Sequence, residues 1–249
     1  MVPAIFEPWG RDLLDTVAPA PGMHLLDVAC GTGIVARLAA SRVGPAGRVA
    51  ALDANETMLA VARTQPAQAG VSIEWHHGDA THLPFAEAAF DIVVCQQGLQ
   101  YMTDRLAALR EMRRVLAPHG RLALSIFRRS LGHETLRRSA APHVGETAAD
   151  VVMEPFSFPD ADALCALFEQ AGLPNARLQA KTLTARFPSI DGFIEYQLGG
   201  RLAGAAGKLS SAARAALVDA LREAFVPYSG SNGVEFPMEA NVVLAGETA

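Results

Sequence analysis

A glycine-containing turn between an apolar run and an amphipathic segment constrains the fold of this 249-residue chain more than any other feature. The stretch, residues 25–38, reads LLDVACGTGIVARL. Its apolar start predicts a buried strand, and the pattern after Gly33 predicts the beginning of a helix. Glycine lets a backbone approach a ligand closely. We therefore expect a strand, a loop and a helix around a small-molecule site.

Strand and helix signals alternate along the first half of the chain. The expected strands cover residues 23–29, 48–53, 71–77, 90–96 and 121–127. The expected helices cover residues 6–17, 33–43, 55–68 and 106–116, with Asn55 as an N-cap and a turn at 118–120. Repeated strand–helix units predict an α/β fold with a mostly parallel sheet and helices on both faces.

The pattern changes after about residue 128. Residues 128–155 are polar and carry no strand signal, whereas 160–171, 190–202 and 210–225 are typical of helices. Residues 175–187 and 234–245 look like strands. Because no repeat or low-complexity linker separates the halves, we expect one domain over residues 1–249. Its ligand-binding core spans about 5–128, and helical insertions at about 129–157 and 188–226 cover the mouth of the sheet.

Composition excludes several classes of partner. The net charge is −5 and the arginines are scattered, so no basic stripe for nucleic acid is expected. The chain contains no run of 18 apolar residues, so no membrane span is expected. Three widely separated cysteines suggest neither a disulfide framework nor a metal site, and they favour a cytoplasmic location. A homodimer is left open.

Two cofactors compete for the glycine loop. Residues 31–36 fit the dinucleotide pattern G-x-G-x-x-G/A, and Asp53 follows Gly33 by 20 residues, which suits an NAD(P)-dependent oxidoreductase. However, Asp27 lies four residues before Gly31, where a carboxylate would repel a pyrophosphate and attract an ammonium group. Asp79 follows a third strand and suits an adenine amino group. A ligand with an ammonium, a ribose and an adenine is S-adenosylmethionine.

Five ordered motifs carry a resemblance to a known family. They are residues 26–33 (LDVACGTG), 53–59 (DANETML), 78–80 with 83–85 (GDA, LPF), 90–94 (FDIVV), and 111–118 with 120 (EMRRVLAP, G). The chain resembles the class I S-adenosylmethionine-dependent methyltransferases, most of all the ubiquinone/menaquinone-biosynthesis-type (methyltransferase domain 11) group, over about residues 5–128. It departs from the family pattern at Ala29 and His119, where glycine is frequent.

The resemblance implies a Rossmann-like, doubly wound sheet of seven mostly parallel strands whose last strand is antiparallel. It also implies methyl transfer by in-line displacement to nitrogen, oxygen or carbon of a small acceptor, with S-adenosylhomocysteine as product. A non-catalytic methyltransferase-like binding protein is the further alternative.

The resemblance assigns cofactor roles by motif position. Asp27 would orient the ammonium group, Asp53 would accept from the ribose hydroxyls and Asp79 from the adenine amino group. The full set of cofactor candidates is Asp27, Ala29, Gly31, Gly33, Asp53, Ala54, Met58, Asp79, Ala80, Gln96 and Gln97.

Acceptor-side candidates follow the fourth strand or lie in the second half. Gln100, Tyr101 and Tyr196 would bind the substrate, although aromatic packing would explain Tyr196 equally well. His133, His143 and Tyr101 are the candidate catalytic groups. Each histidine could serve as a general base or be a solvated loop residue. No metal ligands are expected.

Overall fold

A computed structural model of the chain describes residues 2–66, 71–158 and 160–246. The strands are β1 His24–Val28, β2 Arg48–Asp53, β3 Ile73–His77, β4 Phe90–Gln96, β5 Leu116–Ser130, β6 Arg177–Phe187, β7 Ser229–Gly230 and β8 Gly233–Gly246. Seven of these described strands follow one another in the order β3-β2-β1-β4-β5-β8-β6, and the short β7 pairs with β8. The first five are parallel, and β8 runs antiparallel to both β5 and β6. The expected α/β sheet with an antiparallel last strand is confirmed.

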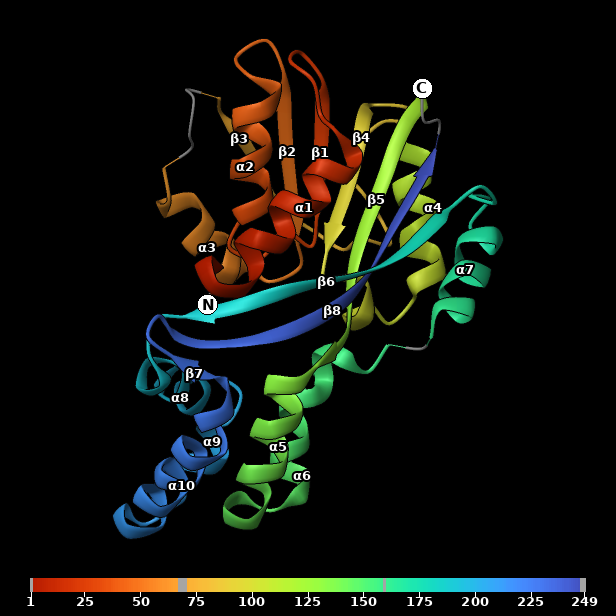
Figure 1. Ribbon diagram of the computed structural model, residues 1–249. Coiled ribbons are helices and arrows are strands. Elements are labelled where there is room, and N and C mark those ends of the chain that lie inside the picture. The colour runs from red at the N-terminus through yellow and green to blue at the C-terminus, as the bar shows by residue number, and fades with distance from the viewer. Residues whose placement is uncertain (1, 67–70, 159, 247–249) are drawn as a thin grey trace.

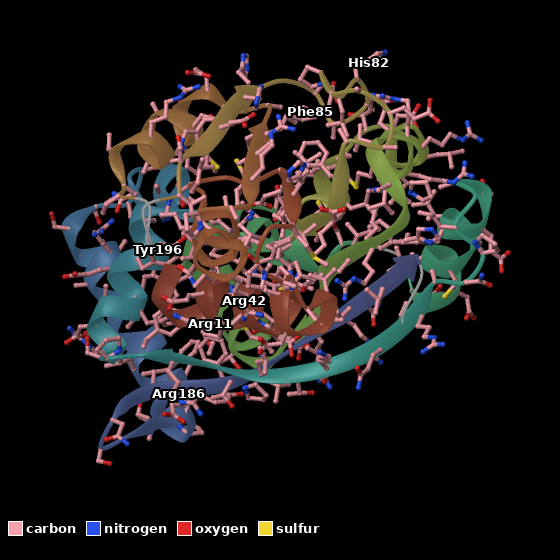
Figure 2. All side chains as sticks on the ribbon, turned by 90° about the horizontal axis from the view of Figure 1, so that it is seen from above. Arg11, Arg42, His82, Phe85, Arg186 and Tyr196 are labelled. Atoms are coloured by element: carbon pink, nitrogen blue, oxygen red, sulfur yellow. The ribbon has the colours of Figure 1, made fainter. Side chains whose placement is uncertain are left out.

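Helices cover both faces of this sheet. On one face lie α1 Glu7–Val17, α2 Ile34–Val43 and α3 Glu56–Thr64; on the other lie α4 Arg105–Val115 and α7 Ala161–Gln170. Figure 2 shows Arg11 of α1 and Arg42 of α2 on one side of the sheet, with His82 and Phe85 on the opposite side. Each face has its own apolar core, because both faces of parallel strands are buried. No helix in the described residues is long and apolar enough to cross a membrane.

Most of the remaining helices gather below the carboxyl ends of the parallel strands (Figure 1). They are α5 Leu131–Val144, α6 Glu146–Asp150, η3 Val151–Phe156, α8 Ile190–Gly199, α9 Ala203–Ala206, α10 Ser211–Ala224 and η4 Val226–Tyr228. We call residues 131–156 and 190–228 the cap. The cap is anchored by aromatic packing, since Phe193 and Phe225 contact Phe236 of β8.

Three local features differ from the sequence prediction. The expected turn at 118–120 lies inside β5, where it forms an irregularity: Phe90 pairs with Leu116, but Ile92 pairs with Arg121. Insertion of extra residues into one strand of a pair produces this kind of bulge. In addition, the polar segment after residue 128 begins as a continuation of β5 before α5 starts, and a short π-helix, η1 Val2–Phe6, precedes α1.

Candidate active site

The loop after β1 folds tightly against the end of β2. Ala29, Gly31 and Gly33 all have positive φ, at 57°, 55° and 80°. A Cβ on Gly33 would lie 2.3 Å from the Trp75 ring, so no side chain fits there. Asp53 fixes the loop, because its Oδ2 accepts from the Gly31 N–H at 2.7 Å and its Oδ1 from the Asn55 N–H at 2.8 Å. The left-handed alanine costs roughly 1–2 kcal/mol, and such strain is concentrated at functional sites.

Asp27 is a fully buried carboxylate with one unpartnered oxygen. Its Oδ2 accepts from the Ala36 N–H at 3.0 Å, whereas Oδ1 has no hydrogen-bond partner among the described residues. Burial, reinforced by the charge of Asp53, raises the Asp27 pKa to about 8, although the Ala36 N–H opposes the shift. A buried carboxylate without a partner is unfavourable. At pH 7 the ligand-free group therefore keeps its proton, and a bound ammonium group would favour the ionised form, so Asp27 fits the role expected of it.

An exposed apolar surface lies beside the loop. Met58 of α3 is 45% exposed, and a Cβ on Gly31 would lie 3.7 Å from its Sδ. Asn55 caps α3 by accepting from the N–H groups of Thr57 and Met58. Ala54 is exposed, and its carbonyl lies 3.1 Å from His77 Nε2. This surface is suited to a flat apolar ring.

Asp79 lies just beyond β3 and is exposed, while Ala80 is buried. The Asp79 Oδ1 accepts from both the N–H and the hydroxyl of Thr81, and these bonds lower the Asp79 pKa. The carboxylate is therefore ionised at neutral pH and its second oxygen can accept from a ligand. The structure thus brings Asp27, Asp53 and Asp79 to the carboxyl ends of neighbouring strands.

Gln96, the last residue of β4, and Gln97, which follows it, use their side chains within the protein. Gln96 Nε2 donates to the carbonyl of Phe6 at 2.8 Å, which ties the N-terminal segment to β4. Gln97, with φ 54°, donates to Ser125 Oγ at 2.9 Å and accepts from the Phe127 N–H at 2.7 Å. The backbone here lies against the glycine loop, because a Cβ on Gly98 would fall 2.5 Å from the Ala29 Cβ.

The residues after β4 connect the sheet to the cap. Gln100 is buried, donates to Gln97 Oε1 at 3.2 Å, and leaves its own Oε1 without a partner among the described residues. Tyr101 is 53% exposed, and its hydroxyl accepts from Arg201 Nη2 at 3.0 Å. Arg201 also donates to Glu154 at 2.9 Å. We call Tyr101, Arg201 and Glu154 the clasp.

Arg201 is a functional candidate that the sequence prediction missed. Its charge lowers the pKa of His133 and opposes the upward shifts that burial causes at Tyr101 and Tyr196. Arg201 therefore lies within electrostatic reach of three acceptor-side candidates from different elements. In the sequence it is one of many scattered arginines, and only the fold reveals its position.

The two candidate histidines occupy different environments. His133 is buried; its Nδ1 lies 2.9 Å from Ser130 Oγ and its ring 5.0 Å from that of Phe156. Burial and the Arg201 charge lower the His133 pKa to about 4, so the ring is neutral at pH 7. His143 is half-buried near the other end of α5. Ten residues of helix separate the two by roughly 15 Å, so they do not face one site together. Tyr196 lies on α8 of the cap (Figure 2).

Comparisons with known proteins agree with this geometry. A family described as "Methyltransferase domain" matches residues 25–120. The chain is 34% identical over 180 residues to the ubiquinone/menaquinone biosynthesis C-methyltransferase UbiE of Ralstonia pickettii, covering 66% of this chain and 73% of the relative. It is 36% identical over 181 residues to the 2-phytyl-1,4-naphtoquinone methyltransferase of Thermosynechococcus vestitus, covering 68% and 80%.

Among solved structures, a putative methyltransferase from an antibiotic biosynthesis pathway of Anabaena variabilis shares the fold, with a TM-score of 0.68, 14% identity and coverage of 96% and 97%. These similarities do not favour an oxidoreductase. The chain therefore belongs to the class I S-adenosylmethionine-dependent methyltransferases, in the group that contains the ubiquinone/menaquinone biosynthesis enzymes.

Proposed function

We propose that S-adenosylmethionine binds at the carboxyl ends of β1, β2 and β3, and that a small acceptor binds between β4 and the cap. The observation that carries the proposal is Asp27, a buried carboxylate with an unpartnered oxygen beside a left-handed loop. Asp27 orients the ammonium group, Asp53 accepts from the ribose hydroxyls and Asp79 from the adenine amino group. Ala54 and Met58 form the adenine wall.

The bound cofactor supplies an electrophilic methyl group on a sulfonium, and the protein supplies orientation. Holding an acceptor atom in line with that methyl group accounts for about 7–11 kcal/mol of barrier lowering in well-oriented reactions. Gln96 and Gln97 contribute by fixing the end of β4, since their amides bond to Phe6, Ser125 and Phe127. Gln100 is held against Gln97 at this fixed end, and Tyr101 extends from it to Arg201 of the cap.

A general base is needed most by hydroxyl and carbon acceptors. His133 is neutral at pH 7 and lies beside Phe156 near the clasp, but its pKa of about 4 makes it a weak base, so it is better suited to contact the acceptor than to remove a proton from it. Tyr101 already accepts from Arg201, so its own hydrogen remains available to donate. His143 lies near the far end of α5 and is the weakest candidate.

The acceptor we propose is a small, partly apolar metabolite. The names of the relatives, which include a phytyl-naphthoquinone methyltransferase, support an aromatic ring. Phe156 is half-buried and packs on the buried rings of Phe127 and His133, with centroid separations of 5.7 and 5.0 Å, so the accessible part of its ring is what an aromatic acceptor would contact. Mass and NMR analysis of the methylated product would identify the methylated atom.

We further propose that residues 1–249 form one domain, because β8 pairs with both β5 and β6 and so joins the C-terminal residues to the core sheet. The absence of a nucleic-acid partner is proposed from the scattered basic residues, and a homodimer stays open. A cytoplasmic location is proposed from the free thiols of Cys30, Cys95 and Cys165.

Calorimetric titration with S-adenosylhomocysteine tests the cofactor site. Asp53→Asn should weaken binding by roughly 10- to 100-fold, because hydrogen bonds to a charged group contribute about 1.5–3 kcal/mol. Asp15→Asn is the matched control, since Asp15 is exposed on α1 and pairs with Arg42. If the two variants bind S-adenosylhomocysteine with equal affinity, Asp53 does not accept from the ribose hydroxyls. Binding without turnover of any acceptor would favour the non-catalytic alternative.

A further inference from the structure

Arg201 presents unused hydrogen-bond donors on the acceptor side of the cap. Its Nη1 donates to Glu154 and, at 3.4 Å, to the carbonyl of Val151, and its Nη2 donates to Tyr101. A guanidinium has five N–H donors, so the Nε–H and one hydrogen on Nη2 remain without a partner among the described residues. Nε and Nη2 form the side-on edge that matches a carboxylate.

The Glu154 carboxylate already occupies part of this guanidinium. Its side chain is 58% exposed, and that of Arg201 is 33% exposed. Exposed ion pairs contribute little to stability, so one carboxylate can replace another on Arg201 at small cost. Tyr101 accepts from Arg201 and therefore has its O–H free to donate to the same incoming oxygen.

One half-buried aromatic ring, Phe156, lies beside the clasp, and the rings behind it, His133, Phe127 and Trp9, are buried. Phe156 lies two residues after Glu154 and contacts the rings of His133 and Phe127, and Phe127 in turn contacts Trp9 at 5.9 Å. A cation beside a partly accessible aromatic ring has the chemistry to hold an aromatic acid, with the acid's ring against Phe156 and its carboxylate on the guanidinium.

We propose that the acceptor is an aromatic carboxylate, that Arg201 is the specificity-determining residue that binds its oxyanion, and that Glu154 occupies Arg201 until the acceptor arrives. This inference rests on the proposed methyl transfer and names the acceptor class of the same site. It assigns opposite roles to two partners of one ion pair, Arg201 attracting the acceptor and Glu154 competing with it.

The opposite roles give the experiment its design. Protein saturated with S-adenosylhomocysteine is titrated with benzoate and with benzamide, its neutral counterpart of the same shape, and binding is followed by calorimetry or ligand-observed NMR. The wild type should bind benzoate at least about tenfold more tightly than benzamide. Arg201→Gln should weaken benzoate binding by roughly 10- to 100-fold and leave benzamide within about twofold.

Glu154→Gln should strengthen benzoate binding by about two- to fivefold, because it removes the competing carboxylate. Arg186→Gln is the matched control, since it breaks an exposed Arg–Glu pair between β6 and β8 and should leave both probes unchanged (Figure 2). Arg201→Lys keeps the charge and should retain part of the benzoate preference, which keeps the test valid if Arg201→Gln is unstable.

Equal binding of benzoate and benzamide by the wild type would overturn the inference, as would weaker benzoate binding in Glu154→Gln. Weaker benzoate binding in Glu154→Gln would show that Glu154 holds Arg201 in place and does not compete with the acceptor. If the wild type binds S-adenosylhomocysteine but shows no benzoate preference, only the acceptor class fails. If it does not bind S-adenosylhomocysteine, the proposed function fails first.

Discussion

Replacing Asp27 by asparagine should remove a pH-dependent penalty from the stability of the ligand-free protein. Burial raises the Asp27 pKa from 3.8 to about 8, so the folded state keeps a proton that the unfolded chain loses above pH 3.8. Stability conferred by this proton is present at low pH and falls as the pH rises toward 8. The slope is about 1.4 kcal/mol per pH unit, and the loss stops above pH 8.

His133 has the opposite effect over part of this range. Its pKa falls from 6.5 to about 4, so the folded state holds fewer protons than the unfolded chain between those values, and stability rises with pH there. The two effects cancel in the wild type between about pH 4 and 6.5. From pH 6.5 to 8 only Asp27 acts, and the free energy of unfolding should fall by about 2 kcal/mol.

Urea denaturation of wild type and Asp27→Asn between pH 5 and 9 measures this directly. The variant should gain stability up to pH 6.5 and then stay level, whereas the wild type should stay level and then decline. Because His133 is present in both proteins, the difference between the curves isolates Asp27. Parallel curves would refute the argument that Asp27 is desolvated and unpaired.

The same carboxylate should couple cofactor binding to proton release. An ammonium group beside Asp27 Oδ1 favours the ionised form, so binding at pH 7 should release roughly 0.9 of a proton from a group of pKa about 8. Calorimetry with S-adenosylhomocysteine in buffers of different ionisation enthalpy measures this number. Proton-neutral binding would mean that the ammonium group lies elsewhere.

Two further predictions concern the loop and the clasp. Gly33→Ala should destabilise the protein by more than Gly22→Ala in thermal unfolding. Both positions have positive φ, at 80° and 86°, and a non-glycine residue there costs roughly 1–2 kcal/mol. Only at Gly33 would the added methyl group also clash with Trp75. Similar losses in the two variants would show that Trp75 moves freely. Arg201→Gln should raise the Tyr101 pKa above its wild-type value, because the guanidinium lowers it by charge and by hydrogen bonding. NMR titration of the protein labelled with ¹³C-tyrosine follows the resonances of its three tyrosines, and the spectrum of Tyr101→Phe identifies the one that belongs to Tyr101. If the pKa of Tyr101 is the same in Arg201→Gln and in the wild type, the clasp is absent in solution.

The sheet could be predicted because its strands and turns are determined mainly by residues close together in the sequence. A buried run such as residues 25–28 and the glycine turn after it depend on neighbours in sequence, and the alternation of such units limits the topology. The three acids at strand ends could be placed together for the same reason, since the carboxyl ends of parallel strands meet at one edge. The irregularity at 117–120 escaped prediction, because Pro118 and Gly120 carry turn signals whether they lie in a loop or in a bulge.

The acceptor side depends on contacts between distant residues, and sequence patterns there could not separate the candidates. His133 and His143 have equivalent sequence contexts, yet one is buried beside Phe156 and the other lies near the far end of the same helix. Arg201 bonds to Tyr101 across 100 residues of sequence. No periodicity encodes such a contact; it exists because the turn after α8 and the segment after β4 are brought to the same end of the sheet.

This difference has a physical consequence for how the site works. The cofactor half is fixed by backbone geometry, such as the left-handed loop and the Asp53 bonds to Gly31 and Asn55, and it tolerates little change. The acceptor half instead includes the Arg201–Glu154 ion pair, which is partly exposed and therefore weak and exchangeable. Substitutions at Arg201 and Glu154 should therefore change which acceptor binds while S-adenosylhomocysteine affinity stays within about twofold, because additivity holds for sites without shared partners. A parallel loss of cofactor affinity in Arg201→Gln would show that the clasp also holds the glycine loop.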